Sequence, residues 1–133
     1  MPVDYAAALD VYQRFADQGD PHAQCNLGIM YGLGLGVEQS YYKAMTWYAE
    51  AAHKGNSKAQ ANLGWMYGTG RATPQDYTSA YAWYSVAGAP GEDIARSNRD
   101  LLAQGMTPSQ LERAQDGAKE IVRKIAANEG QLI

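Results

Sequence analysis

Residues 20–55 read DPHAQCNLGIMYGLGLGVEQSYYKAMTWYAEAAHKG, and residues 56–91 read NSKAQANLGWMYGTGRATPQDYTSAYAWYSVAGAPG. The two stretches align without a gap, and 16 of their 36 positions are identical. Self-similarity at a fixed period is typical of proteins built from stacked structural repeats. The repeat therefore decides the fold class. The identical pairs include Ala23/Ala59, Asn26/Asn62, Leu27/Leu63, Gly28/Gly64, Tyr31/Tyr67, Trp47/Trp83 and Tyr48/Tyr84.

The same register continues beyond both copies. Tyr5 and Tyr12 stand one period before Tyr41 and Tyr48, and Ala95, Asn98 and Leu102 stand one period after Ala59, Asn62 and Met66. We therefore expect a single domain over residues 1–133. Its predicted parts are a half repeat (4–19), two full repeats (20–55 and 56–91), a second half repeat (92–105) and a capping helix (107–128).

Each repeat is expected to form two helices. Ala23, Leu27 and Tyr31 recur every four residues and so share one face of a first helix. Asp20 is a suitable N-cap for that helix, and Ser40 is a suitable N-cap for the second one. Each pair has an apolar face that only a neighbouring pair can bury. Trp47 and Trp83 are expected in that core.

Glycines inside the first helices need an explanation, because a glycine there costs about 1 kcal/mol relative to alanine. We attribute Gly28 and Gly64 to a close helix–helix approach, with a Trp or Tyr of the neighbouring helix packed over the gap. Gly55 is expected in a left-handed conformation after a second helix. His53 and Lys54 precede it and suit the negative end of that helix dipole.

The C-terminal stretch predicts a long amphipathic helix. Thr107, Pro108 and Gln110 form a capping box with a proline in the first turn. A helix from residue 108 to about 128 is predicted to close the open end of the stack. Its apolar side consists of Leu111, Ala114, Ala118, Ile121, Val122 and Ile125.

Composition excludes several classes of function. The net charge is −3 and no basic stripe is visible, so the sequence does not predict nucleic-acid binding. No run of 18 apolar residues predicts a membrane span. The single cysteine, Cys25, excludes an internal disulfide framework. Neither the cysteine count nor the N-terminal sequence assigns a compartment, because a signal peptide could have been removed.

The repeat resembles the Sel1-like repeat, a relative of the tetratricopeptide repeat. The resemblance implies an all-α, right-handed α/α superhelical solenoid with a C-terminal capping helix. It also implies an adaptor that binds a peptide or protein in a concave groove lined by the first helices, and members that are often bacterial. The second unit departs from the pattern at Arg71-Ala72-Thr73 and at Gly88. The matching positions of the first unit are Ala23, Leu27, Gly28, Tyr31, Gly34, Gly36, Val37, Ala44, Trp47, Tyr48, Ala51, Ala52 and Gly55.

Residues that break the repeat are the better candidates for binding a partner. Trp65 replaces Ile29 of the first unit, and Trp, Tyr and Arg dominate binding hot spots. Asn26, Asn62 and Asn98 recur every 36 residues and would form a row along the stack. These asparagines either hydrogen-bond an extended peptide or tie adjacent repeats together. The predicted groove therefore contains Asn26, Ile29, Asn62, Trp65 and Asn98.

Catalysis has little support in the sequence. His22 and His53 lack metal-ligand companions at suitable spacing, so no metal or cofactor is predicted. Cys25 aligns with Ala61 and is expected to be a small, partly buried thiol. The adjacent acids Glu92 and Asp93 suit a helix N-terminus.

An alternative to the adaptor is a structural module that self-associates. The first helix has no partner in front of it, so the side bearing Leu9, Val11 and Phe15 is exposed or shared with a second copy in a homodimer. The incomplete first repeat also suggests a fragment of a longer chain. The sequence names no partner, affinity or pathway.

Overall fold

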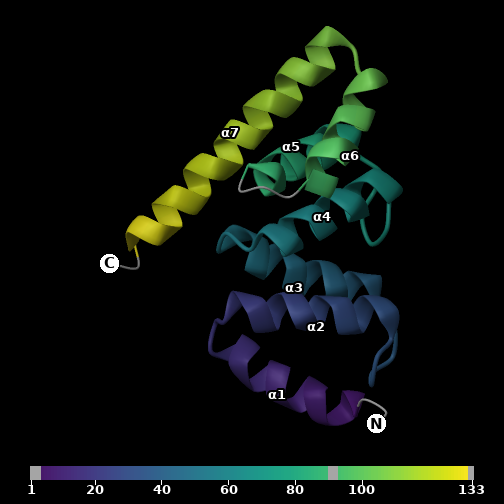
Figure 1. Ribbon diagram of the computed structural model, residues 1–133, viewed down its shortest axis with the longest axis vertical. Coiled ribbons are helices and arrows are strands. Elements are labelled where there is room, and N and C mark those ends of the chain that lie inside the picture. Colours follow the sequence, from purple (N-terminus) through teal and green to yellow (C-terminus); the bar gives the residue numbers. More distant parts are fainter. Residues whose placement is uncertain (1–3, 90–92, 132–133) are drawn as a thin grey trace.

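The computed structural model describes residues 4–89 and 93–131 (Figure 1). These residues form seven helices and no strand. Helices α1 to α6 stack in chain order from one end of the molecule to the other, and α7 runs diagonally along the side (Figure 1). The chain is an all-α solenoid, as predicted. The helices are α1 (Tyr5–Asp17), α2 (Pro21–Leu33), α3 (Tyr41–His53), α4 (Ser57–Thr69), α5 (Tyr77–Gly88), α6 (Asp93–Gln104) and α7 (Pro108–Gln131).

The helices pair as the repeat predicts. Helix α2 packs on α3 and α4 packs on α5, while α1–α2, α3–α4 and α5–α6 contacts join successive pairs. Both predicted caps are present: Asp20 accepts from the backbone N–H of His22, and Ser40 accepts from that of Lys43. Gly55 adopts the expected left-handed conformation, with φ at 92°. The unit boundaries stay a prediction, and the boundary at residues 91 and 92 lies outside the described residues.

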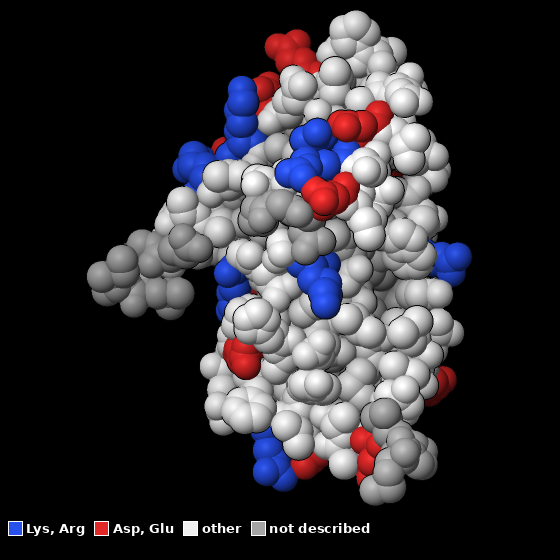
Figure 2. Space-filling view, viewed as in Figure 1, with Lys and Arg blue, Asp and Glu red and all other residues white. Residues whose placement is uncertain are grey.

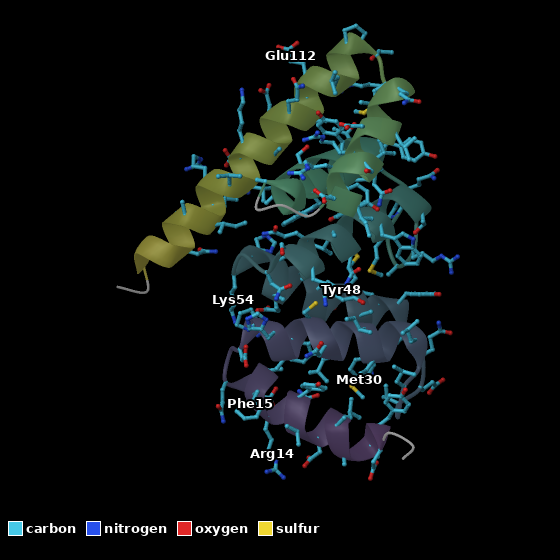
Figure 3. All side chains as sticks on the ribbon, viewed as in Figure 1. Arg14, Phe15, Met30, Tyr48, Lys54 and Glu112 are labelled. Carbon is cyan, nitrogen blue, oxygen red and sulfur yellow. The ribbon has the colours of Figure 1, made fainter. Side chains whose placement is uncertain are left out.

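The two mid-helix glycines allow tyrosine rings to approach the first helices. A Cβ atom at Gly28 would lie 2.5 Å from Cε1 of Tyr48, and one at Gly64 would lie 2.9 Å from Cδ1 of Tyr84. Both rings are buried, and Tyr48 lies where α3 meets α2 (Figure 3). The predicted close approach is thus confirmed, and the aromatic residue is tyrosine in both units.

The two equivalent tryptophans differ in their burial. Trp83 is buried in the central core together with Leu63 and Met66. Trp47 is half-buried and packs against a separate cluster that includes Leu27. The helical core prediction therefore holds fully for Trp83 and partly for Trp47.

Buried glutamines tie consecutive pairs together. Nε2 of Gln24 donates to the carbonyl oxygen of Ala16 at the end of α1, over 3.2 Å. One period later, Nε2 of Gln60 donates to the carbonyl oxygen of Ala52 near the end of α3, over 3.1 Å. A buried amide needs such partners because leaving it unpaired costs about 1–3 kcal/mol. These bonds fix where each first helix meets the helix before it.

The third unit uses an arginine at the same register. Nη1 of Arg96 donates to the carbonyl oxygen of Gly88 over 3.3 Å. A Cβ atom at Gly88 would lie 2.5 Å from Cγ of Arg96. The replacement of alanine by Gly88 therefore makes room for the longer side chain, so the departure from the repeat is a packing change.

Lys54 connects α3 to the turn between α1 and α2. Its Nζ donates to the carbonyl oxygen of Gly19 over 2.9 Å, and it lies beside that turn (Figure 3). The lysine therefore binds the carbonyl group of Gly19 after α1, whereas the sequence predicted that it serves the end of its own helix. His53 does act locally, because its Nδ1 lies 2.7 Å from the carbonyl oxygen of Ala49.

Helix α7 covers the second helices and not the far side of α6. It packs along α5 and reaches α3 (Figure 1). The capping box at its start is confirmed, since the backbone N–H of Thr107 donates to Gln110 Oε1 and the backbone N–H of Gln110 donates to Thr107 Oγ1. The helix ends at residue 131 rather than near 128. Ala114 and Ile125 are buried, but Val122 is exposed.

The outer face of α5 explains where α7 binds. Thr46 and Glu50 of α3 are exposed, whereas their counterparts Ala82 and Val86 of α5 are buried. Apolar residues at these two positions give α7 a surface to pack on. Gly117 of α7 sits against Ala82, where an added Cβ would lie 3.6 Å from the alanine methyl group.

Charged residues are spread over the visible face of the molecule. Figure 2 shows Lys and Arg mixed with Asp and Glu along α7, without a continuous basic stripe on this face. Among the helices of the described ranges, none combines the length and apolar character needed to cross a bilayer.

Candidate functional site: a groove along the first helices

A groove runs along α2, α4 and α6, the first helices of their units. A cavity of 390 Å³ lies between α2 and α4, and two cavities of 260 and 310 Å³ lie between α4 and α6. Trp65 lines all three and is 43% exposed, so its indole forms a ridge between the two parts. The buried rings of Tyr48 and Tyr84 line the floor on either side. We call this the first-helix groove.

The glycine–tyrosine packing that builds the fold also shapes this groove. Gly28 and Gly64 let the rings of Tyr48 and Tyr84 approach the first helices closely. The same rings then line the cavities beside Trp65. The floor of the groove is therefore part of the packed core, which makes it a rigid surface.

Trp65 belongs to an aromatic and cationic cluster. Its ring centroid lies 6.4 Å from that of Tyr41, at an interplanar angle of 51°. The guanidinium carbon of Arg71 lies 5.1 Å from the Tyr41 ring and 5.6 Å from the Trp65 ring. Nη1 of Arg71 donates to the Tyr41 hydroxyl over 3.0 Å. The aromatic and cation–π contacts restrict the indole, and the hydrogen bond between Arg71 and Tyr41 holds its two partners together.

Arg71 and Trp65 are both departures from the first unit, which has Leu35 and Ile29 at these positions. The sequence predicts a binding role for Trp65 but shows Arg71 only as part of a departure from the repeat pattern. It does not show that both substitutions meet on one ring, Tyr41. The contact joins α3 to the end of α4, and no periodicity within one helix could reveal it.

The groove ends in a polar cavity at the start of α2 and α4. This cavity has a volume of 350 Å³. Its character differs from that of the α2–α4 cavity, since amide, hydroxyl and basic side chains replace most of the aromatic ones. It is lined by His22, Cys25, Asn26, Asn56, Ser57 and Lys58.

All five predicted groove residues line these cavities. Ile29, Asn62 and Trp65 meet in the cavity between α2 and α4. Asn98 lines the cavities between α4 and α6, and Asn26 lies apart from the others in the polar cavity. Shared linings show proximity, while the binding role of these residues stays a prediction.

The asparagines have different surroundings. Burial raises the pKa of the Tyr84 hydroxyl, and a hydrogen bond from the Asn98 side chain partly offsets this effect. Because Tyr84 belongs to α5 and Asn98 to α6, this bond supports the alternative in which the row ties neighbouring helices together. Asn62 lies beside the exposed indole of Trp65, where an amide can reach a bound chain.

Cys25 and His53 pack in the fold and do not form a reactive site. Cys25 is buried, and burial raises the pKa of its thiol to about 11, against a smaller opposing effect of Lys58. A thiol with this pKa is protonated at neutral pH and is a poor nucleophile. The ring centroid of His53 lies 5.4 Å from that of Trp83, at an interplanar angle of 76°. Within the described ranges, His, Cys, Asp and Glu form no cluster of three that could hold a metal ion.

Stacked helix pairs with an open groove along one layer define a helical-repeat solenoid. The Sel1 repeat family matches residues 1–20, 21–56 and 57–89, which together make up more than half of the chain. The chain belongs to the Sel1 repeat family. Proteins of this family generally mediate protein–protein interactions and are generally repeat scaffolds without enzymatic activity. No functionally curated protein matches the sequence.

Solved structures of two bacterial proteins have the same fold. The chain is similar to a protective antigen of uropathogenic Escherichia coli strains that displays an SLR fold, with 30% identity and a TM-score of 0.88 over 92% of this chain. It is also similar to a Sel1 repeat protein from Oxalobacter formigenes, with 28% identity and a TM-score of 0.72 over 86% of this chain. The matches span 27% and 50% of those two proteins.

Proposed function

We propose that this chain is a protein-interaction adaptor whose first-helix groove binds an extended peptide segment of a partner protein. The observation that carries this proposal is the exposed Trp65 indole, held by Tyr41 and Arg71 where the first unit has Ile29. Binding energy in protein interfaces concentrates on Trp, Tyr and Arg residues that sit in a preformed setting.

Further exposed apolar side chains lie along the same groove. Leu33 extends it beside α2, and Ile94 and Leu101 extend it beside α6. Contiguous apolar surface of this kind marks interaction sites in soluble proteins. In the proposed complex, the amides of Asn26 and Asn62 hydrogen-bond the extended backbone of the peptide, since an amide both donates and accepts.

The test is selection from a phage-displayed library of random 12-residue peptides with the full chain as bait. Selected peptides are then measured by fluorescence anisotropy against wild type, Trp65→Ala and Tyr42→Ala. Tyr42 is the matched control, because it is an exposed aromatic residue of α3 that lines none of the groove cavities. We expect a loss of about 30-fold for Trp65→Ala, the size of a hot-spot residue.

The control variant should keep wild-type affinity. Peptides that bind wild type and Trp65→Ala equally well would contradict the groove proposal. Circular dichroism melting of both variants shows whether any loss reflects unfolding.

The second candidate function is self-association through α1. Val11 and Phe15 are 47% and 49% exposed on the end of the stack, and Arg14 and Phe15 lie on α1 (Figure 3). Leu9 does not share this surface, because it packs against the cluster around Leu27. Sedimentation velocity of wild type and Phe15→Ser over a 100-fold concentration range tests it. A wild-type monomer throughout that range would contradict a homodimer.

We propose no catalytic or cofactor-dependent role for the chain. The buried, protonated Cys25 thiol and the structural contacts of His53 support this view. A hydrolytic or redox activity that survives purification to homogeneity would contradict it.

A further inference from the structure

The start of the second unit carries a different charge from the start of the first. Asn56, Ser57 and Lys58 stand where the first unit has Asp20, Pro21 and His22. Asn56 still caps its helix, because its side chain accepts the backbone N–H of Ala59 over 2.9 Å. The cap is thus kept while its negative charge is lost, and a permanent positive charge is added two residues later.

Helix stability does not explain Lys58. The first turn of a helix is the positive end of its dipole, where a cation is disfavoured and an acid is favoured. Across the residues that the structure describes, Lys58 forms no ion pair. It also lines the polar cavity, the α2–α4 cavity and one α4–α6 cavity, so it stands where the parts of the groove meet.

The described residues that line the groove around Lys58 include no acid. The chain as a whole has 14 acidic residues against 11 Lys and Arg. In an acidic protein, the described lining of this groove therefore carries a positive formal charge. Such a groove attracts anionic groups and disfavours basic ones.

We propose that the occupant of the groove is an acidic peptide segment. Its carboxylate side chain pairs with Lys58, and a large apolar side chain packs on Trp65. This inference rests on the proposed function and specifies its partner. Lys58 and Trp65 lie seven residues apart on α4, a distance of about 10 Å along the helix. A chain extended in the polyproline II conformation covers that distance in about three residues, and its three-residue period places the side chains of residues i and i+3 on one face. The expected motif is Asp or Glu with a large apolar residue three positions away.

The test uses the peptides selected by the full chain and a parallel selection with Lys58→Glu. An acid is favoured in the first turn of a helix, so this variant should fold at least as well as wild type. Wild type should enrich Asp or Glu three positions from Trp, Phe or Leu. Lys58→Glu should enrich Lys or Arg at the acidic position and keep the apolar one.

A double-mutant cycle on one selected peptide measures the pairing directly. Replacing the peptide carboxylate by its amide, or Lys58→Gln in the protein, should each weaken binding about fivefold, with no further loss when both are made. Lys43→Gln is the control, because Lys43 lies over the Tyr31 ring outside the groove cavities. It should leave the affinity unchanged.

The outcomes separate this inference from the function on which it rests. Selected peptides that need Trp65 but show no acidic residue, or that bind Lys58→Gln as tightly as wild type, overturn the acidic partner and leave the groove intact. Peptides whose affinity is unchanged by substitution of either Trp65 or Lys58 would contradict the groove as the binding site. Selection of basic peptides by wild type would contradict the proposal that the occupant of the groove is acidic.

Discussion

Gly28 and Gly32 lie one turn apart on α2 and face the same tyrosine, yet alanine should have opposite effects at the two positions. A Cβ atom at Gly28 would lie 2.5 Å from Tyr48 Cε1, whereas ordinary contact begins at 3.4 Å, so the ring would have to move by about 0.9 Å. Tyr48 is buried between helices and has little room to do so. A Cβ atom at Gly32 would meet Ala44 at 3.7 Å and the Tyr48 hydroxyl at 3.8 Å, which is ordinary contact.

The two free-energy terms give the sign of each effect. Overpacking a core costs about 1–3 kcal/mol, and replacing a helical glycine by alanine contributes up to about 1 kcal/mol. Gly28→Ala should therefore destabilise the chain by about 1 kcal/mol, a decrease of roughly 3–5 °C in the melting temperature. Gly32→Ala should stabilise it by about 0.5 kcal/mol, because it lies near the helix end where propensity counts less.

Urea and thermal unfolding followed by circular dichroism measure both changes. The second unit repeats the experiment independently, since Gly64 corresponds to Gly28 with a 2.9 Å contact and Gly68 corresponds to Gly32 with a 3.6 Å contact. Gly64→Ala should lower stability less than Gly28→Ala does. Equal shifts for Gly28→Ala and Gly32→Ala would refute the argument that ring approach, and not helix propensity, determines the need for glycine.

Two further predictions concern Cys25 and Ala72. Burial raises the pKa of the Cys25 thiol from 9.0 to about 11. Iodoacetamide at pH 8 should therefore label the folded chain about a hundredfold more slowly than the urea-unfolded chain. Equal labelling rates would contradict the burial of Cys25. The folded thiol keeps its proton longer than the unfolded one, so its contribution to stability is present below pH 9 and is lost towards pH 11. Ala72 has a φ of 63°, where the first unit has Gly36. Ala72→Gly should therefore raise the free energy of unfolding by about 0.5–1 kcal/mol in urea titrations, and a loss of stability would show that the alanine side chain makes a needed contact.

Much of the fold follows from the sequence because the determining interactions are local and repeated. The caps at Asp20 and Ser40 use bonds within three residues, and the capping box at Thr107 and Gln110 does the same. The close approach at Gly28 also follows, because a costly glycine repeated at one register needs a structural reason. Interactions of this kind can be recognised in a window of a few residues.

The position of α7 did not follow, although its helical character did. Amphipathicity shows that the helix has an apolar side but does not show which surface receives that side. That information lies 30 residues upstream, where Thr46 and Glu50 of the first unit become Ala82 and Val86 in the second. The burial of Gln24 and Gln60 does not follow from the sequence for a related reason. Glutamine is usually an exposed residue, and only its bond to a distant carbonyl explains its burial.

The two full repeats of this chain share the residues that build the fold and differ at residues that give each repeat its own surface. Positions that stay the same, such as Gly28/Gly64 and Gln24/Gln60, form the same packing contacts in both full units. Several of the positions that change lie on two surfaces in the structure. One of them carries α7. The other is the first-helix groove, where Lys58, Trp65 and Arg71 replace His22, Ile29 and Leu35. These three changes alter the chemistry of the groove while the stacked helices around it keep their arrangement. We therefore expect that chemistry, and not the solenoid that supports it, to select the partner.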